Sequence, residues 1–531
     1  MRKNTIPLSD TGLFNNVIID YVHEKESLSE FVDNFSNPNS IEKKIKSLDF
    51  KNRKVLTSVL KSQYEKTIFS NFDKKKIFRK IEILNRKNTY TICSGHQLNI
   101  FLSPLFLIYK IIGLISYKEY LNKKFPNFQC VPIFWLASED HDFDEIKKIR
   151  SNNNEYSWNI DNKSAVGNLS TGTLVDILNS IKNDLCKNKY GEDLYEIFEN
   201  AYTKNNDLSS ATSSIIGSLF SNHEIIVLDA NERELKRLFV SHLKKEILEN
   251  EIYKCVSDTN KKLVSKKYKP QINALKFNIF YMTNGLRAKI KFNESYFYSE
   301  SHNKRWTKNE IISEIDKYPE RFSPNVFFRT LYQQYILPNV LYIGGPSEIC
   351  YWLQLRSSFR SFGIPFPILQ LRPFYLLVSQ KSSQFYKNFN LSESDFFKPK
   401  NFKFRKIIHK TSQFDFDKLE SDKKFFLKQI ENQTSNTKNF NSQSLDSFKK
   451  KLENEINKFK IKIIRTEKNN NMDLEKKIES VDSYHFIDNL IQEKSHSFFY
   501  YFIKYGPSFF DLILKQNLVF DNKYIILKET E

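Results

Sequence analysis

Three short apolar stretches of this chain each end in a polar turn that leads into a helical pattern. The stretches cover residues 90–93, 131–137 and 340–343, and the turns read Ser-Gly-His-Gln-Leu-Asn, Ser-Glu-Asp-His-Asp and Gly-Gly-Pro-Ser-Glu. Strand, turn and helix in this order predict an α/β fold with a parallel sheet. Because ligands of such sheets lie beyond the carboxyl ends of the strands, we expect the three turns to meet in one crevice.

Two more apolar stretches, at residues 225–229 and 368–371, extend the predicted core. The segments between are polar and Asn-rich, or mix helix with alternating strands, so we interpret them as insertions. A chain of 531 residues is also too long for a single core. We predict core segments at 1–150 (with N-terminal helices), 223–248 and 323–390, and connecting insertions at 151–222 and 249–322.

The nearly apolar residues 100–117 approach the length of a membrane span. They contain Lys110, however, and Ser103-Pro104 fits a helix start, with serine at the N-cap and proline at the first helical position. A helix buried between a sheet and another layer is also apolar on most faces. We therefore expect a buried helix and no membrane partner.

Beyond residue 390 the chain is dense in Lys, Glu, Asn and Ser. Apolar residues recur there at steps of three and four, as in a coiled coil: Leu445, Phe448, Leu452, Ile456, Phe459 and Ile463. An amphipathic helix lying on the core is the alternative. Polar residues 431–444 interrupt the pattern, which indicates two helices joined by a loop. We predict a helical coiled-coil arm at 391–483 that forms a homodimer, followed by a helical segment at 484–531.

The formal net charge of +20 is compatible with nucleic-acid binding. The lysines are scattered among Asn, Ile and Phe, however, and only 12 glycines occur, as codon bias in an AT-rich genome would produce. The chain has no zinc-finger spacing, no RNP-like motif and no dense basic tract, so nucleic acid is not the expected partner.

Cysteine usage indicates the inside of the cell. The five cysteines are widely spaced and form no Cys-x-x-Cys pair, which argues against a disulfide framework or a structural zinc site. The N-terminal residues lack the apolar region of a signal peptide. We expect a cytoplasmic protein.

The first polar turn offers neutral and titratable groups. Gly95 allows a sharp turn, His96 can donate to a phosphate or carboxylate, and Gln97 and Asn99 can hold a polar ligand. The alternative is a loop whose side chains cap the next helix.

The second turn places Glu139, Asp140, His141 and Asp142 in a row. Adjacent carboxylates repel, so at least one pKa is expected to rise unless a cation compensates. Such groups can act as a general base toward an amine, or bind an ammonium or a metal-bound phosphate. The alternative is that Asp140 caps the next helix and the other acids occupy its first turn.

In the third turn Gly344 and Gly345 allow close backbone approach before a helix start that favours negative charge. It matches neither a Walker A loop nor G-x-G-x-x-G, and a tight structural turn capped by Ser347 is the alternative. Arg372 ends the last predicted core strand, where arginine suits a bidentate carboxylate.

Taken together, these runs resemble the cysteine-adding enzymes of bacillithiol biosynthesis, the BshC family. The resemblance is carried by Ser94-Gly95-His96-Gln97 with Pro104-Leu105 and Ile108-Tyr109-Lys110, by Pro132 to Phe143 (PIFWLASEDHDF), and by Tyr342 to Trp352 (YIGGPSEICYW). Residues 325–338 and 362–372 also fit the family.

The resemblance implies a Rossmann-like core shaped like class I aminoacyl-tRNA synthetases, two connecting insertions and a dimerising C-terminal coiled coil. It also implies a ligase that adds L-cysteine to the amino group of glucosaminyl-malate in the last step of bacillithiol biosynthesis. A cysteinyl adenylate formed with ATP and Mg²⁺, or another activated donor, would supply the reactive carboxyl. No loop of the K-M-S-K-S type is present, so the sequence leaves the cosubstrate open.

We hypothesise that the glycines of the first and third turns and His96 surround the anionic donor, that the acidic turn binds or deprotonates the ammonium, and that Arg329 or Arg372 holds the malate carboxylates. The predicted catalytic residues are Glu139, Asp140, His141 and His96, and the predicted substrate-binding residues are Gly95, Gln97, Asn99, Asp142, Asn325, Arg329, Gln334, Gly344, Gly345, Glu348, Tyr351, Trp352 and Arg372. No residue is assigned to a metal.

This chain departs from the family pattern at two positions. His96 stands where the family often has glutamine, and Lys494 stands where the family has arginine, which removes bidentate geometry.

Two other functions remain open. One is a metal-dependent hydrolase or transferase with Glu139, Asp140, His141 and Asp229 as ligands, and the other is a non-enzymatic coiled-coil scaffold or RNA-binding protein.

Overall fold

The computed structural model describes residues 1–70, 72–151, 154–161, 164–283, 285–438, 440–517 and 519–530. Its chain forms two compact units. The larger unit combines Pro7–Tyr375 with Glu493–Ile525, and the smaller one combines Met1–Ile6, Leu376–Gln492 and the residues from Ile526 onward. Each unit is therefore assembled from segments that are far apart in the sequence.

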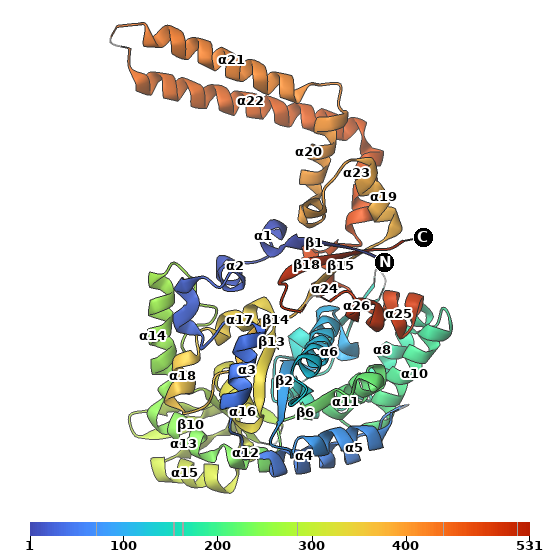
Figure 1. Ribbon diagram of the computed structural model, residues 1–531, viewed down its shortest axis with the longest axis vertical. Helices are drawn as coiled ribbons and strands as arrows, with labels where there is room; N and C mark the ends of the chain where they lie inside the picture. Colours follow the sequence, from blue (N-terminus) through green and yellow to red (C-terminus); the bar gives the residue numbers. More distant parts are fainter. Residues whose placement is uncertain are drawn as a thin grey trace. The chain divides into compact units, whose positions relative to one another are not determined.

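A five-stranded parallel sheet forms the centre of the larger unit (Figure 1). Its strands, in spatial order, are β14 (Ile368–Leu371), β13 (Asn339–Gly344), β2 (Thr89–His96), β3 (Gln129–Leu136) and β6 (Ile226–Asp229). Every neighbouring pair is parallel, and nearly all strand residues are buried, as expected of a sheet covered on both faces. The predicted α/β fold with a Rossmann-like parallel core is confirmed.

Strand β2 is longer than the apolar pattern predicted. Ser94, Gly95 and His96 continue the strand, so the turn begins only at Gln97. Ser94 Oγ donates to the Ile343 carbonyl at 2.7 Å, and a Cβ atom on Gly95 would lie 2.8 Å from the carbonyl oxygen of Trp135. Close packing between strands explains why small residues end this strand.

The apolar segment after β2 forms helix α6 (Phe106–Lys124), which is buried along most of its length. Its N-cap is Leu105, so the predicted capping by Ser103 is wrong. In the described residues no helix is long and apolar enough to cross a membrane. The predicted buried helix is confirmed.

The remaining elements of the larger unit surround this sheet. The N-terminal helices are α1 (Leu8–Thr11), α2 (Asn16–Val22), α3 (Pro38–Ser47), α4 (Arg53–Lys66) and α5 (Lys74–Ile83); the first insertion holds α8 (Leu174–Ser180), α9 (Lys182–Leu185), α10 (Lys189–Lys204) and α11 (Leu208–Leu219). After β6 come α12 (Arg233–Leu238), α13 (Val240–Glu249), α14 (Glu251–Ser265), β7 (Ile279–Thr283), β8 (Leu286–Lys289), β9 (Lys291–Asn293), β10 (Tyr296–Ser299), β11 (Lys304–Trp306), α15 (Lys308–Lys317), β12 (Phe322–Pro324), α16 (Val326–Ile336), α17 (Pro346–Trp352) and α18 (Arg356–Ser361); α25 (Phe499–Tyr505) and α26 (Ser508–Leu514) follow near the C-terminus.

The smaller unit is mainly helical and contains a two-helix arm (Figure 1). Its helices are α19 (Gln380–Asn388), α20 (Lys400–Thr411), α21 (Phe416–Ser435), α22 (Ser442–Asn470) and α23 (Met472–Asp482). The arm consists of α21 and α22, which are joined by ion pairs of Lys460 with Glu420 and of Lys449 with Glu431. Helix α21 ends at Ser435 and α22 begins at Ser442, both within the polar interruption of the sequence pattern.

Both chain ends contain strands that the sequence analysis did not predict. β1 (Arg2–Pro7) and β18 (Lys523–Lys528) belong to a three-stranded sheet in the order β1–β18–β15, where β15 is Phe374–Val378. The segment expected to be helical from 484 therefore ends in a strand.

Candidate active site

The three polar turns meet at the carboxyl edge of the central sheet. Gln97, after β2, donates from Nε2 to Asp140 Oδ2 of the next turn at 2.7 Å. Lys110 of α6 donates from Nζ to the Gly95 carbonyl at 2.6 Å and contacts Glu348, in the third turn, at 2.6 Å. The predicted crevice is thus held together by side chains from all three turns.

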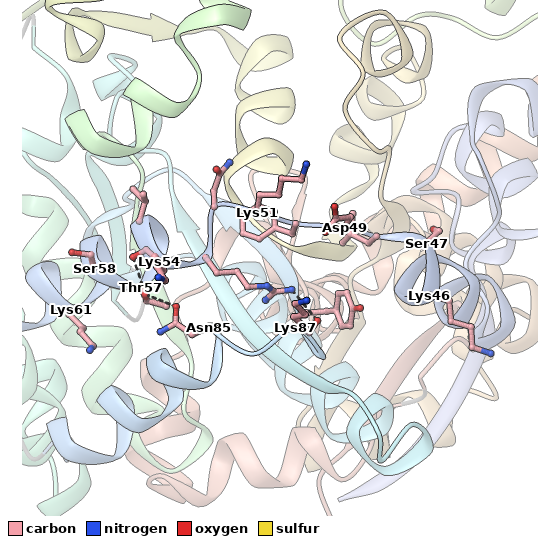
Figure 2. A pocket seen from close by; sticks show the side chains of 16 residues that line it. Lys46, Ser47, Asp49, Lys51, Lys54, Thr57, Ser58, Lys61, Asn85 and Lys87 are labelled. Atoms are coloured by element: carbon pink, nitrogen blue, oxygen red, sulfur yellow. Dashed lines mark hydrogen bonds between the residues drawn. The ribbon is translucent and has the colours of Figure 1, made fainter.

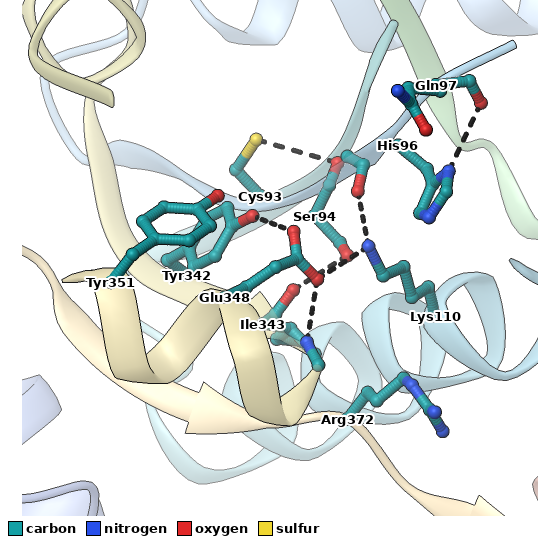
Figure 3. Close-up of polar contacts among 12 residues, drawn as sticks. Cys93, Ser94, His96, Gln97, Lys110, Tyr342, Ile343, Glu348, Tyr351 and Arg372 are labelled. Atoms are coloured by element: carbon teal, nitrogen blue, oxygen red, sulfur yellow. Dashed lines mark hydrogen bonds and ion pairs between the residues drawn. The ribbon is translucent and has the colours of Figure 1, made fainter. Parts of the chain in front are cut away.

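An ion pair joins the buried Lys110 to the partly buried Glu348 of the third turn (Figure 3). Glu348 also accepts hydrogen bonds from the Tyr342 hydroxyl at 2.6 Å and from the Gly345 N–H at 2.7 Å. Burial alone would raise the pKa of Glu348, but the charge of Lys110 and these hydrogen bonds lower that pKa to about 2. Glu348 is therefore a carboxylate at neutral pH.

Sequence reasoning missed Lys110 as a site residue. Burial lowers its pKa, whereas the charge of Glu348 opposes this shift, and the side chain is almost completely inaccessible. Lys110 is the single charged residue of the nearly apolar stretch 100–117, and this is the signal that could have identified it, because a buried charge requires a partner.

Gly344 and Gly345 make room for Glu348 and also support its carboxylate. A Cβ atom on Gly344 would lie 2.9 Å from the Tyr342 ring, and Gly345 is the N-cap residue of α17. The exposed Ser347 does not cap this helix, so that alternative is wrong. We had expected the Gly345 N–H to face an anionic donor, but it donates its hydrogen bond to Glu348 instead.

His96 lies at the end of β2 with its ring 4.9 Å from that of Phe106. Burial and the nearby charge of Lys110 lower the pKa of His96 to about 3. Its imidazole is therefore neutral at physiological pH. A neutral ring can donate or accept one hydrogen bond at the crevice but carries no positive charge.

In the acidic turn Asp140 is the best-supported carboxylate. It accepts from Gln97 and from the backbone N–H groups of His141 at 2.8 Å and Asp142 at 3.3 Å. Although burial would raise the pKa of Asp140, hydrogen bonds from His141 and Gln97 and the charge of Arg287 hold it well below its usual range. The pKa of Asp140 does not rise as repulsion between adjacent carboxylates alone would require, because these hydrogen bonds and the charge of Arg287 compensate.

Two cations contact the acidic turn. Lys236 comes from α12, the helix after β6, and Arg287 comes from β8 in the predicted second insertion. Lys236 of α12 forms an ion pair with Glu139 and donates to the Phe322 carbonyl at 3.2 Å. Arg287 of β8 lies over the Phe280 ring at 3.9 Å and donates to His141 Nδ1 at 2.8 Å. Neither residue stood out in the sequence, since both lie far from the turn that they neutralise.

Asp140 does not cap a helix. The short helix α7 (Phe143–Ile146) has Asp142 as its N-cap residue, without a side-chain hydrogen bond. The alternative that Asp140 caps the next helix is therefore wrong, and its side chain is 30% exposed beside the half-exposed His141.

Arg329 of α16 lies near the same edge of the sheet. It donates to Gln333 Oε1 at 3.0 Å and to the Tyr351 hydroxyl at 3.2 Å, and its guanidinium lies 5.9 Å from the Trp135 ring. Arg329 is thus a partly accessible cation of the predicted substrate-binding set, and its partner Tyr351 is buried.

Five predicted binding residues are buried and serve the scaffold instead. Asn99 donates to the Glu145 carbonyl, Asn325 accepts from two N–H groups at the start of α16, and Gln334 donates to the Asn339 carbonyl. Trp352 packs on the Tyr342 ring at 4.6 Å. Arg372 makes two hydrogen bonds, of 2.8 and 2.7 Å, to the carboxylate of Glu493.

A hollow of about 1210 Å³ lies elsewhere on the larger unit (Figure 2). It is lined by residues at the start of α4 and by Lys87 and Tyr90, next to the amino end of β2. A smaller hollow of about 580 Å³ adjoins the acidic turn and is lined by His141, Asp142 and Asp161 among others. The smaller one is the better candidate, because ligands of parallel sheets bind at the carboxyl ends of the strands.

The proposed ligands of a metal-dependent enzyme have other partners. Asp229 accepts from Ser138 Oγ at 2.5 Å and from Ser209 Oγ at 2.6 Å, while Glu139 pairs with Lys236. Over the part of the chain that the structure describes, no group of three or more His, Cys, Asp and Glu side chains is arranged to hold a metal ion.

Comparison with known proteins identifies relatives along the whole chain. The N-terminal Rossmann-like domain of bacillithiol biosynthesis BshC matches residues 1–373, and the C-terminal coiled-coil domain of BshC matches residues 375–529. A Flavobacterium johnsoniae protein named "Putative cysteine ligase BshC" is 33% identical, covering 97% of this chain and 98% of that protein. Proteins of the same name are 31% identical in Christiangramia forsetii, covering 99% of each chain, and 24% identical in Lysinibacillus sphaericus, covering 97% and 98%.

Proposed function

This chain belongs to the BshC family of bacillithiol biosynthesis, and we propose that it is the ligase that joins L-cysteine to the amino group of glucosaminyl-malate. The observation that carries the proposal is the hydrogen bond between Gln97 and Asp140, which ties an ionised, partly exposed carboxylate into the crevice at the carboxyl edge of the sheet. A fixed carboxylate at this position suits a substrate that carries an ammonium group.

Asp140 has the role of binding the acceptor ammonium. Its strongly lowered pKa makes it a better anion than base, so it holds and orients the amino group beside the donor. The ammonium loses one proton to solvent water before its nitrogen attacks the carboxyl carbon of cysteine, and the nitrogen releases a second proton to water as the amide forms. The attack forms the amide C–N bond as the bond between that carbon and the activating group breaks.

The activated cysteine donor requires hydrogen-bond donors or cations that stabilise the negative charge on its oxygens. Amide formation in water needs an activated carboxyl, and the crevice offers the neutral imidazole of His96 and the guanidinium of Arg329 near the Lys110–Glu348 pair. We assign His96 and Arg329 to the oxygens of the activated cysteine carboxyl, where fixed donors stabilise developing charge.

The same family assignment supports a proposal for the assembly and location of the protein. We propose a cytoplasmic homodimer that associates through α21 and α22, which carry large exposed apolar side chains such as Phe425 and Phe459. Light scattering should give twice the chain mass for the wild type, and Phe425→Glu with Phe459→Glu should give the monomer. A monomeric wild-type protein would contradict the dimer without affecting the ligase assignment.

The experiment that tests the function is mass spectrometry of purified protein incubated with cysteine and glucosaminyl-malate. A product heavier than the acceptor by one cysteinyl residue establishes the ligase. Parallel reactions with and without ATP and Mg²⁺ identify the activation chemistry. Folded protein that forms no such product with any nucleotide would refute the proposed reaction.

A further inference from the structure

We propose that Arg287 fixes His141 as the Nε2–H tautomer, so that His141 donates a hydrogen bond to a substrate oxygen and does not act as the base. The inference rests on the proposed function and assigns two roles within it. Arg287 becomes a positioning residue, and His141 becomes a neutral donor next to the carboxylate of Asp140.

The tautomer follows from hydrogen-bond chemistry. Arg287 Nη1 lies 2.8 Å from His141 Nδ1, and a guanidinium has donors but no acceptor. Nδ1 must therefore accept, which leaves the ring proton of the neutral imidazole on Nε2. With 46% of its side chain exposed, His141 can present this N–H to a ligand in the adjoining hollow.

Asp140 competes with Arg287 for the same ring nitrogen. Asp140 Oδ1 is 3.6 Å from His141 Nδ1, too far for a hydrogen bond but close enough to form one after a small movement. If it did, Nδ1 would carry the proton and Nε2 would become a proton acceptor, as in an Asp–His pair that serves as a general base. Arg287 thus decides between a donor and a base.

Arg287 is fixed by three other contacts, which favour its hydrogen bond to His141 Nδ1 over one between Nδ1 and Asp140. Its Nε donates to Ser323 Oγ at 2.9 Å, its Nη2 donates to the Pro324 carbonyl at 3.1 Å, and its guanidinium lies over the Phe280 ring at 3.9 Å. Asp140 meanwhile has partners in Gln97 and two backbone N–H groups. Glu139 and Asp142 are the other charged residues of the same turn, and Glu139 pairs with Lys236.

The consequence for the substrate is chemical. An Nε2–H donor fits a hydroxyl, carbonyl or carboxylate oxygen, all of which an amino-sugar acceptor with a malate group provides. A substrate ammonium would be repelled from a ring whose outward nitrogen carries a proton. The amino group is therefore directed to Asp140 and a neighbouring oxygen to His141.

Nuclear magnetic resonance of the whole protein labelled with ¹⁵N-histidine tests the tautomer without any substrate. The His141 signals are identified by their loss in His141→Gln. We expect the Nε2–H pattern in the wild type and in Asp140→Asn, and the Nδ1–H pattern in Arg287→Met, because Asp140 then attracts the Nδ1 proton. Arg321→Met, which removes another arginine stacked on an aromatic ring, should leave the His141 signals unchanged.

A wild-type Nδ1–H pattern would overturn the inference, and so would an unchanged His141 pattern in folded Arg287→Met. The wild-type and Asp140→Asn spectra decide the question even if Arg287→Met does not fold. An activity arm separates this inference from the ligase assignment. His141→Gln, whose amide N–H replaces the Nε2–H, should retain about tenfold more turnover than His141→Ala. Equal losses of turnover in the two variants would exclude the donor role of His141. An inactive wild type with the Nε2–H pattern would contradict only the ligase assignment.

Discussion

The Nζ atom of Lys110 lies 2.6 Å from the Glu348 carboxylate, with both side chains largely withdrawn from solvent. Lys110→Met should therefore lower the free energy of unfolding by about 3–5 kcal/mol, because it leaves an uncompensated buried carboxylate. Urea denaturation measures the loss. The double variant Lys110→Met, Glu348→Gln should recover at least half of it, since no unpaired charge then remains. A double variant as unstable as the single one would mean that packing around Lys110, and not charge, is responsible.

Asp140→Asn should reduce turnover by about 10²-fold or more, because the acceptor amino group loses the carboxylate that positions it. The amide cannot bind an ammonium as a carboxylate does, although it can still accept from Gln97. Product formation by mass spectrometry measures the effect. Asp258→Asn is the matched control, because Asp258 of α14 is highly exposed, pairs with Lys261 and does not line the hollow beside the acidic turn. Equal activity of both variants would exclude Asp140 from the reaction.

His96→Gln should keep turnover within about fivefold of the wild type, since a glutamine amide can replace a neutral imidazole as a hydrogen-bonding group. The pKa of His96 is lowered to about 3, so the wild-type rate should show no titration of this ring between pH 6 and 9. His96→Ala, which removes the hydrogen-bonding group, should be much slower. A pH-dependent rate that becomes flat in His96→Gln would contradict the assignment.

Arg372→Lys should affect stability more than substrate binding. Lysine keeps the charge but loses the paired geometry with Glu493, which should cost about 1.5–3 kcal/mol in the free energy of unfolding. The KM for glucosaminyl-malate should stay within twofold, because the guanidinium is fully engaged inside the protein. A large increase in KM with unchanged stability would instead support our sequence-based idea that Arg372 holds the malate carboxylates.

Glu246 should make stability depend on pH. Its carboxyl is buried between α13 and α14, and burial raises its pKa to about 7 despite hydrogen bonds from Ile252 and Asn278. The folded protein therefore retains this proton up to pH 7, whereas the unfolded chain releases it near 4.5. Stability should fall by about 3 kcal/mol as the pH rises between these values.

Urea denaturation at pH 5 and pH 7.5 measures this slope. In Glu246→Gln the slope should flatten, while Glu249→Gln, at an exposed position of the same helix, should keep it. An equally steep slope in Glu246→Gln would assign the pH dependence to other groups.

The core strands could be predicted because buried parallel strands are continuous apolar runs. Residues 368–371 coincide with β14, and residues 340–343 lie within β13. The end of β2 could not be located in this way, since Ser94, Gly95 and His96 look like turn residues. They continue the strand because they pair with β3, a contact that no local pattern contains.

The site was predictable only in part for a related reason. The titratable residues of the turns are visible because they follow apolar strands, but their partners Lys110, Lys236 and Arg287 come from three other elements. Which cation meets which acid depends on the fold. Without these cations the sequence predicted a raised carboxyl pKa in the acidic turn, whereas Asp140 is a strongly ionised anion.

The discontinuous make-up of the larger unit has a consequence for synthesis on the ribosome. Arg372 is made long before Glu493, yet the two form a buried ion pair inside that unit. Until the ribosome has translated the intervening segment, a nascent larger unit would hold a guanidinium without its counter-charge. The larger unit can therefore complete its folding only when nearly the whole chain has left the ribosome. A messenger RNA truncated before codon 493 would yield a product that cannot fold fully and is open to degradation.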